Sequence, residues 1–164
     1  MTDFRALLEN LAKAGVQFIV VGGAAATAHG SARLTADLDI VYQRSPDNLR
    51  RLVRALEQFH PYPRGAPPGL PFLWDERTVS NGLNFTLVTG LGDLDLLGEI
   101  TGGGGYDRLL PYSVVLRVFG SECRCLDLER LIQVKRAAGR PKDLEAIAEL
   151  EAILEERAGS APEP

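Results

Sequence analysis

The stretch VGGAAATAHGSARLTADLDIV, residues 21–41, has a glycine pair at one end and a pair of acids near the other. Gly22 and Gly23 close the β-branched run 16–23, which predicts a buried strand that stops at a tight turn. The small residues of 24–30 predict a short helix directly after this turn. The glycines are therefore expected at the junction between a strand and a helix.

The two acids of this stretch, Asp37 and Asp39, lie in an apolar run, 36–42, that predicts a second strand. Because side chains alternate along a strand, both carboxylates point to one face, with Cα atoms about 6.6 Å apart, while Leu38 and Ile40 point to the core. Carboxylates on one face repel each other unless a cation lies between them, and a divalent ion with oxygen ligands suits that place. A solvated polar strand face is the alternative.

A third carboxylate is available in DLDLL, residues 93–97, a second apolar run that carries acids. If this run pairs beside 36–42, one of its acids joins the first pair. We favour Asp95, which stands between two leucines, over Asp93, which follows a glycine and is expected nearer the strand edge. Three carboxylates can hold two Mg²⁺ ions about 4 Å apart, an arrangement used in phosphoryl transfer.

The glycine pair itself is compatible with phosphate binding. Without side chains, Gly22 and Gly23 would let backbone N–H groups approach a phosphate at the start of the helix. A plain tight turn is the alternative explanation. The spacing matches neither the G-x-G-x-x-G dinucleotide motif nor the G-x-x-x-x-G-K-[ST] loop, so neither of those sites is predicted.

The rest of the chain predicts an α/β (α+β) protein with a mixed β-sheet flanked by helices and with two C-terminal helices. We expect one domain, 1–158, and a disordered tail, 159–164. The proline-rich segment 61–71 is expected to be a loop and the glycine-rich segment 101–107 a flexible connection. Further helices are predicted at 3–14, 45–59, 128–139 and 140–159, and further strands at 83–89, 93–100, 113–120 and 122–128.

Charge and hydropathy narrow the function classes. The net charge of −4 disfavours broad, non-specific binding of long nucleic acids, although a local basic groove is compatible with it. No apolar run has membrane-spanning length, and the N-terminus is typical of an amphipathic helix rather than a signal peptide. We therefore expect a cytoplasmic protein without a membrane association.

The combined pattern resembles the signature of the nucleotidyltransferase superfamily, which has the polymerase β-like fold. In that signature an apolar residue and a Gly-Gly or Gly-Ser pair precede an acid–apolar–acid–apolar motif. Here Val21-Gly22-Gly23 is followed, after thirteen residues, by Asp37-Leu38-Asp39-Ile40. The segment Arg33-Leu34-Thr35-Ala36-Asp37 resembles the R-x-T-x-D form of the AbiEii-like, or minimal nucleotidyltransferase, group, and the third acid of the superfamily maps to Asp95.

A second resemblance lies near the C-terminus. The segment 135–143, KRAAGRPKD, is similar to the K…R-x-K-D motif of the AbiEii-like group, in which the basic residues are associated with nucleotide phosphates. It implies phosphate-binding roles for Lys135 and Lys142. Two features depart from the family: Gly23 replaces the serine often found there, and AbiEii proteins of the toxin type carry a larger helical region.

The resemblance implies a metal-dependent enzyme that transfers a nucleoside monophosphate from an NTP to an acceptor hydroxyl and releases pyrophosphate. The acceptor could be RNA, a protein or a small molecule, and a helical protein is a candidate partner. The metal would be two Mg²⁺ ions, with Mn²⁺ as an alternative. The implied catalytic and metal-binding residues are Asp37, Asp39 and Asp95, and the implied nucleotide-binding residues are Gly22, Gly23, Arg33, Thr35, Lys135 and Lys142.

Two alternatives remain open from the sequence. The fold could serve a weakly active or inactive nucleotide-binding or regulatory protein, for example one component of a toxin–antitoxin pair. The same acids could also serve a metal-dependent phosphohydrolase, which would release phosphate without forming an adduct.

Overall fold

The computed structural model describes residues 1–160, and within them a mixed seven-stranded sheet forms the centre of the molecule. Its strand order is β3-β4-β5-β2-β1-β9-β8. The strands are β1 (Phe18–Val21), β2 (Asp37–Tyr42), β3 (Tyr62–Pro63), β4 (Asn84–Thr89), β5 (Gly92–Leu97), β8 (Ser113–Val118) and β9 (Ser121–Leu126). Two short strands, β6 (Glu99–Ile100) and β7 (Gly104–Gly105), pair separately. The predicted α/β class with a mixed sheet is confirmed.

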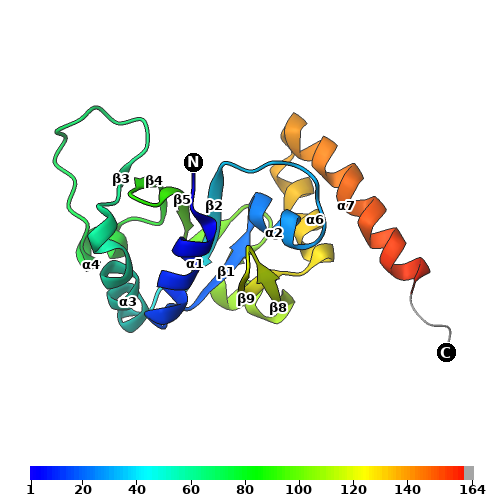
Figure 1. The fold of residues 1–164 in the computed structure, drawn as a ribbon, viewed down its shortest axis with the longest axis horizontal. Helices are drawn as coiled ribbons and strands as arrows, with labels where there is room; N and C mark the ends of the chain where they lie inside the picture. Colours follow the sequence, from blue (N-terminus) through cyan, green and yellow to red (C-terminus); the bar gives the residue numbers. More distant parts are fainter. Residues whose placement is uncertain (161–164) are drawn as a thin grey trace.

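Helices gather at both sides of this sheet, with α1, α3 and α4 on the left in Figure 1 and α2, α6 and α7 on the right. Their bounds are α1 (Phe4–Lys13), α2 (Gly22–Ala28), α3 (Pro46–Leu56), α4 (Glu76–Asn81), α5 (Tyr106–Leu109), α6 (Leu128–Ala138) and α7 (Pro141–Gly159). Short 3₁₀ turns cover Glu57–Phe59 and Leu110–Tyr112. No helix of the described residues is long and apolar enough to span a membrane.

The pairing of β2 decides which side chains meet. β2 runs parallel to β5, with Asp37 opposite Asp93 and Asp39 opposite Asp95. It runs antiparallel to β1, and this pairing places Val21, the last residue before the glycines, opposite Asp39. All four acids consequently share one face of the sheet. The alternate residues of β2 and β5 are fully buried in the core on the other face: Leu38, Ile40, Leu94 and Leu96.

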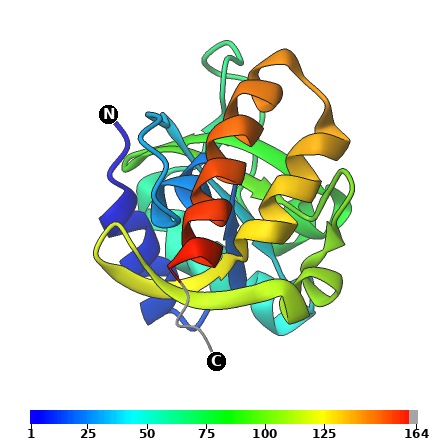
Figure 2. The ribbon, with the colours of Figure 1, turned by 90° about the vertical axis from the view of Figure 1, so that its right-hand side faces the viewer.

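The two C-terminal helices pack side by side, as Figure 2 shows, and their junction is defined by local signals. Asp127 caps α6 by accepting a hydrogen bond from the backbone N–H of Arg130. Gly139 ends this helix in the left-handed region, at φ 65°, where glycine carries no steric penalty. Pro141 then occupies the first turn of α7, as helix-start rules predict. α7 continues to Gly159, and residues 161–164 of the predicted tail lie outside the described residues.

Several local predictions differ from the structure, among them the loop expected at 61–71, which contains β3. The first strand ends at Val21 rather than 23, because Gly22 already begins α2. The segment 101–107 is not simply a flexible connection, since it contains β7 and the start of α5. α4 was not predicted, although Asp75 provides a normal N-cap by accepting from the backbone N–H of Thr78.

Candidate active site

The turn between β1 and α2 passes directly over the acids. Gly22 has φ +63°, and a Cβ atom added there would lie 2.1 Å from Oδ2 of Asp39. Both the backbone conformation and the close approach therefore require glycine at this position. The fold thus brings the two ends of the stretch 21–41 together, with the glycine turn against the second acid.

The next glycine also approaches a side chain closely, in the loop before β2. A Cβ atom at Gly23 would lie 2.6 Å from Oγ1 of Thr35, whose hydroxyl donates a hydrogen bond to the backbone carbonyl of Asp37. The Thr35 side chain thus occupies the space that a side chain at 23 would need. This contact gives a physical reason why position 23 is a glycine and not the serine that is often found there in the nucleotidyltransferase superfamily.

The three acids singled out in the sequence converge. Asp37, Asp39 and Asp95 each offer a carboxylate oxygen, and these oxygens all lie within 4.8 Å of one another. Oδ1 of Asp39 is buried and has no hydrogen-bond partner among residues 1–160. An unsatisfied buried carboxylate oxygen is costly, so the site favours a cation at this position.

The electrostatics of the acids agree with this geometry. Burial, followed by the negative charges of Asp37 and Asp95, raises the pKa of Asp39 to about 8. Burial also raises the pKa of Asp95, with a further contribution from its contact with Asp37 and an opposing one from Arg64. Clustered carboxylates with raised pKa values in a cleft are typical of a functional site.

Arg64 lies against the same acids, and the sequence analysis did not single it out. Its Nη2 atom donates to Oδ1 of Asp95 at 2.9 Å, its Nη1 atom lies 3.6 Å from Oδ2 of Asp37, and its Nε atom lies 3.5 Å from Oδ1 of Asp93. A single arginine in a proline-rich loop belongs to no pattern that could have predicted this position. Asp93, which was expected nearer the strand edge, is on the acid face and pairs with this arginine.

Basic residues from the two C-terminal helices line the same cleft as the glycines. Lys135 of α6 is half-buried, and this burial lowers its pKa, while the charge of Asp143 opposes the shift. Lys142 lies in the first turn of α7 and is exposed at the edge of the cleft. The two predicted lysines thus line the same cleft as the acids and Gly22.

Two residues near these lysines, Arg140 and Asp143, form an ion pair. The guanidinium of Arg140 donates to Asp143 through Nε at 2.8 Å and through Nη2 at 3.3 Å. Burial on its own would raise the pKa of Asp143, but these hydrogen bonds and the nearby positive charges of Arg140 and Lys135 lower it overall. Asp143 is only 3% exposed, so it anchors the start of α7 from inside the protein.

Arg33 behaves differently from the other predicted basic residues. Its guanidinium lies 3.3 Å from a carboxylate oxygen of Glu145 and 4.0 Å from one of Glu149, both on α7. Arg33 lines the cleft, but in this structure its charge is directed to these two acids. The loop 30–36 is in this way tied to the last helix.

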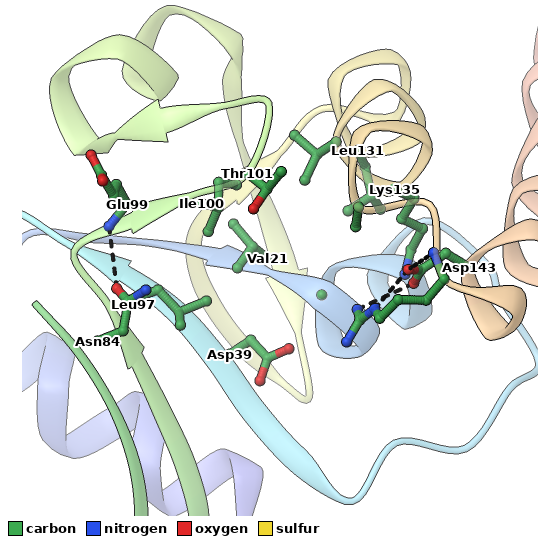
Figure 3. Close-up of a pocket in the computed structure, with 14 residues that line it drawn as sticks. Val21, Asp39, Asn84, Leu97, Glu99, Ile100, Thr101, Leu131, Lys135 and Asp143 are labelled. Atoms are coloured by element: carbon green, nitrogen blue, oxygen red, sulfur yellow. Dashed lines mark hydrogen bonds and ion pairs between the residues drawn. The ribbon is translucent and has the colours of Figure 1, made fainter.

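Two cavities share Asp39, Lys135 and Arg140 among their lining residues. The first, about 330 Å³, is lined by the glycine pair, the three acids and the predicted basic residues. The second, about 400 Å³, is more apolar and lies between α6 and the end of β5. In Figure 3, Asp39 lies at the floor of this second cavity, Lys135 and Asp143 lie on one side, and Glu99 and Asn84 lie on the other.

Comparison with known proteins supports the class of fold. No family model and no curated protein sequence matches the chain. Among solved structures, a candidate nucleotidyltransferase (TM1012) from Thermotoga maritima is similar, with a TM-score of 0.57 and 16% identity over 91% of this chain and 94% of that chain. The lincosamide antibiotic adenylyltransferase LnuA, bound to lincomycin, gives a TM-score of 0.60 and 15% identity over 93% of this chain and 98% of that chain.

The fold and the acid-lined cleft together define the structural class. The chain has the nucleotidyltransferase fold, as the resemblance predicted. Its membership of the AbiEii-like group stays a prediction.

Proposed function

We propose that the protein is a metal-dependent nucleotidyltransferase, which moves a nucleoside monophosphate from an NTP to an acceptor hydroxyl and releases pyrophosphate. The observation that carries this proposal is the meeting of the three acids with the glycine turn and Lys135 in one cleft of a nucleotidyltransferase fold. The cleft has carboxylates that can bind metal ions and donor groups that can bind phosphate, and this reaction requires both.

The acids suit Mg²⁺, with Mn²⁺ as a second choice, because all of their donor atoms are carboxylate oxygens. Asp37, Asp39 and Asp95 would hold two ions, and the unpartnered Oδ1 of Asp39 supports a ligand role for that residue. When bound, the metal would supply positive charge that offsets the negative charge developing on the transferred phosphoryl group. Asp95 would also accept the proton of the attacking hydroxyl.

The remaining cleft residues would hold the triphosphate. Gly22 and Gly23 line the cleft with their backbone, and Lys135 and Lys142 bring positive charge to the same cleft. Thr35 would contribute the hydroxyl that Gly23 lacks. Arg33 would contribute only after exchanging its contacts with Glu145 and Glu149 for a phosphate.

The acceptor is open to RNA, a protein or a small molecule. LnuA is described as an antibiotic adenylyltransferase bound to lincomycin, and this supports a small-molecule acceptor most directly. A toxin–antitoxin role with a helical partner protein and a cytoplasmic location are further parts of the proposal, and they rest on the sequence resemblance and composition.

The proposal is tested with purified protein, Mg²⁺ or Mn²⁺ and each of the four α-³²P-labelled NTPs, first alone and then with candidate acceptors. We expect a labelled adduct and pyrophosphate, both lost with EDTA and reduced more than 100-fold in Asp39→Asn, since this variant loses a metal ligand. Asp107→Asn, at an exposed acid of α5, is the matched control.

The same experiment separates the alternatives. A phosphohydrolase would release phosphate without any labelled adduct. An inactive nucleotide-binding protein would retain labelled NTP on a filter in the presence of metal but would transfer nothing. If neither metal-dependent NTP binding nor transfer occurs, the proposed function is wrong.

A further inference from the structure

Arg64 is held over the acid face by its own backbone and by β4. Its backbone N–H donates to the carbonyl of Thr86 at 2.9 Å, directly after the pairing of β3 with β4. Its Nη2 atom donates to the carbonyl of Leu87 at 2.8 Å. These two hydrogen bonds hold Arg64 over the acid face, although the segment it comes from is proline-rich and mostly irregular.

From that position Arg64 reaches carboxylates on two strands. It contacts Asp37 of β2 and both Asp93 and Asp95 of β5, at distances of 2.9–3.6 Å. Its side chain is 28% exposed, so these contacts are only partly screened by water. Two of these acids, Asp37 and Asp95, belong to the proposed metal site, whereas Asp93 does not.

These contacts have two physical consequences of opposite direction. In the metal-free protein the positive charge of Arg64 reduces the repulsion among the clustered carboxylates and therefore stabilises the fold. The same charge repels a divalent ion, and the Nη2 atom is hydrogen-bonded to Oδ1 of Asp95, a residue of the proposed metal site. Arg64 therefore raises the stability of the metal-free protein and lowers the affinity of the acids for a metal ion.

We propose that Arg64 is the internal counter-ion of the acid cluster, which holds Asp37 and Asp95 together when metal is absent and loosens its contacts with them when a divalent ion binds. Arg64 acts through the acids, so it is a positioning residue rather than a catalytic one. The inference rests on the metal-binding part of the proposed function.

The first test measures Mn²⁺ affinity and stability in Arg64→Gln. Loss of the positive charge should tighten Mn²⁺ binding about tenfold, measured from the electron paramagnetic resonance signal of free Mn²⁺. The midpoint of urea unfolding in EDTA should fall at the same time, because the acids lose their counter-ion. A merely structural arginine would lower stability without tightening metal binding.

Two variants control for charge and for the general loss of an arginine. Arg64→Lys keeps the charge, so its Mn²⁺ affinity should stay within about threefold of the wild type. Arg50→Gln removes an exposed arginine of α3 that pairs with Asp47 and Glu76, and it should leave Mn²⁺ affinity unchanged.

A second measurement uses the wild-type protein and does not depend on the folding of a variant. The Nε–H resonance of Arg64 in ¹⁵N NMR should shift when Mg²⁺ is added and return with EDTA, while that of Arg50 stays in place. No shift at saturating Mg²⁺, or Mn²⁺ binding no tighter in Arg64→Gln than in the wild type, overturns the inference. If the wild type binds no divalent ion at all, the metal-dependent function itself fails, and the counter-ion role fails with it.

Discussion

At the scale of single residues, the site depends on two glycines that lack a Cβ atom for different reasons. Gly22 combines a left-handed backbone with a close approach to Asp39, whereas Gly23 leaves room for the side chain of Thr35. A glycine pair in a sequence indicates a turn, but it does not say which side chain fills the space above it. The partners, Asp39 and Thr35, are supplied by residues 12 to 17 positions further along the chain.

This packing predicts what happens when Gly23 is replaced by the serine that is often found there in the nucleotidyltransferase superfamily. Gly23→Ser should lower the free energy of unfolding by about 1–3 kcal/mol, because its Cβ atom would collide with Thr35. The double variant Gly23→Ser/Thr35→Gly should regain much of this loss, because the new hydroxyl takes the place of the old one. Urea unfolding of both variants, and of Thr35→Gly as the control, measures the coupling. Additive losses would contradict the packing explanation.

At the scale of secondary-structure elements, the strand pairing and the α6–α7 junction assemble the two walls of the cleft. The alternation of acids and apolar residues in β2 and β5 was readable from the sequence. Their parallel pairing in register was not, since α3, β3, the proline-rich loop, α4 and β4 lie between the two strands in the chain. The α6–α7 junction likewise directs Lys135 towards Asp39 through the position of the whole helix pair.

The placement of Lys135 on α6 predicts that replacing this residue weakens NTP binding without lowering the stability of the fold. Lys135→Met should raise the KM for NTP about tenfold, because a charge-assisted contact with phosphate is lost. Stability should not fall, and is expected to rise, because the half-buried amine no longer has to carry a charge. NTP titrations and urea unfolding measure the two effects.

The control for this prediction lies on the same helix. Arg136→Met removes a neighbouring charge that pairs with Glu151 of α7 and does not line the cleft described above. It should leave the KM for NTP unchanged. An equal rise in KM for both variants would mean that the general charge of α6, rather than the position of Lys135, matters.

At the scale of the whole molecule, folding buries a carboxylate, that of Asp39, and brings it close to the charges of Asp37 and Asp95. The pKa of Asp39 is about 8 in the folded protein, above its ordinary value of 3.8, so folding takes up a proton between these values. A group with a raised folded pKa contributes stability at low pH that is lost as pH rises through the folded pKa. Metal-free protein should therefore become less stable from about pH 4 to pH 8.

Asp39→Asn tests this pH dependence. The new amide cannot ionise. The free energy of unfolding of the variant should therefore exceed that of the wild type by on the order of 2 kcal/mol at pH 9 and by much less at pH 4. Urea unfolding in EDTA at both pH values gives the difference, and Asp107→Asn is the exposed control. A stability difference that is the same at pH 4 and pH 9 would contradict the raised pKa of Asp39.

The α/β class, most helices and strands, and the residue types of the site could be predicted from the chain alone, because they depend on local periodicity, capping and the alternation of acids with apolar residues. The resemblance of 21–41 to a known pattern added the fold. Three contacts could be known only from the folded protein: Arg64 lies against the acids, Thr35 fills the space above Gly23, and Arg33 pairs with α7. These contacts join residues from separate loops and strands, and their positions depend on how the complete sheet and its helices pack, for which no local pattern exists.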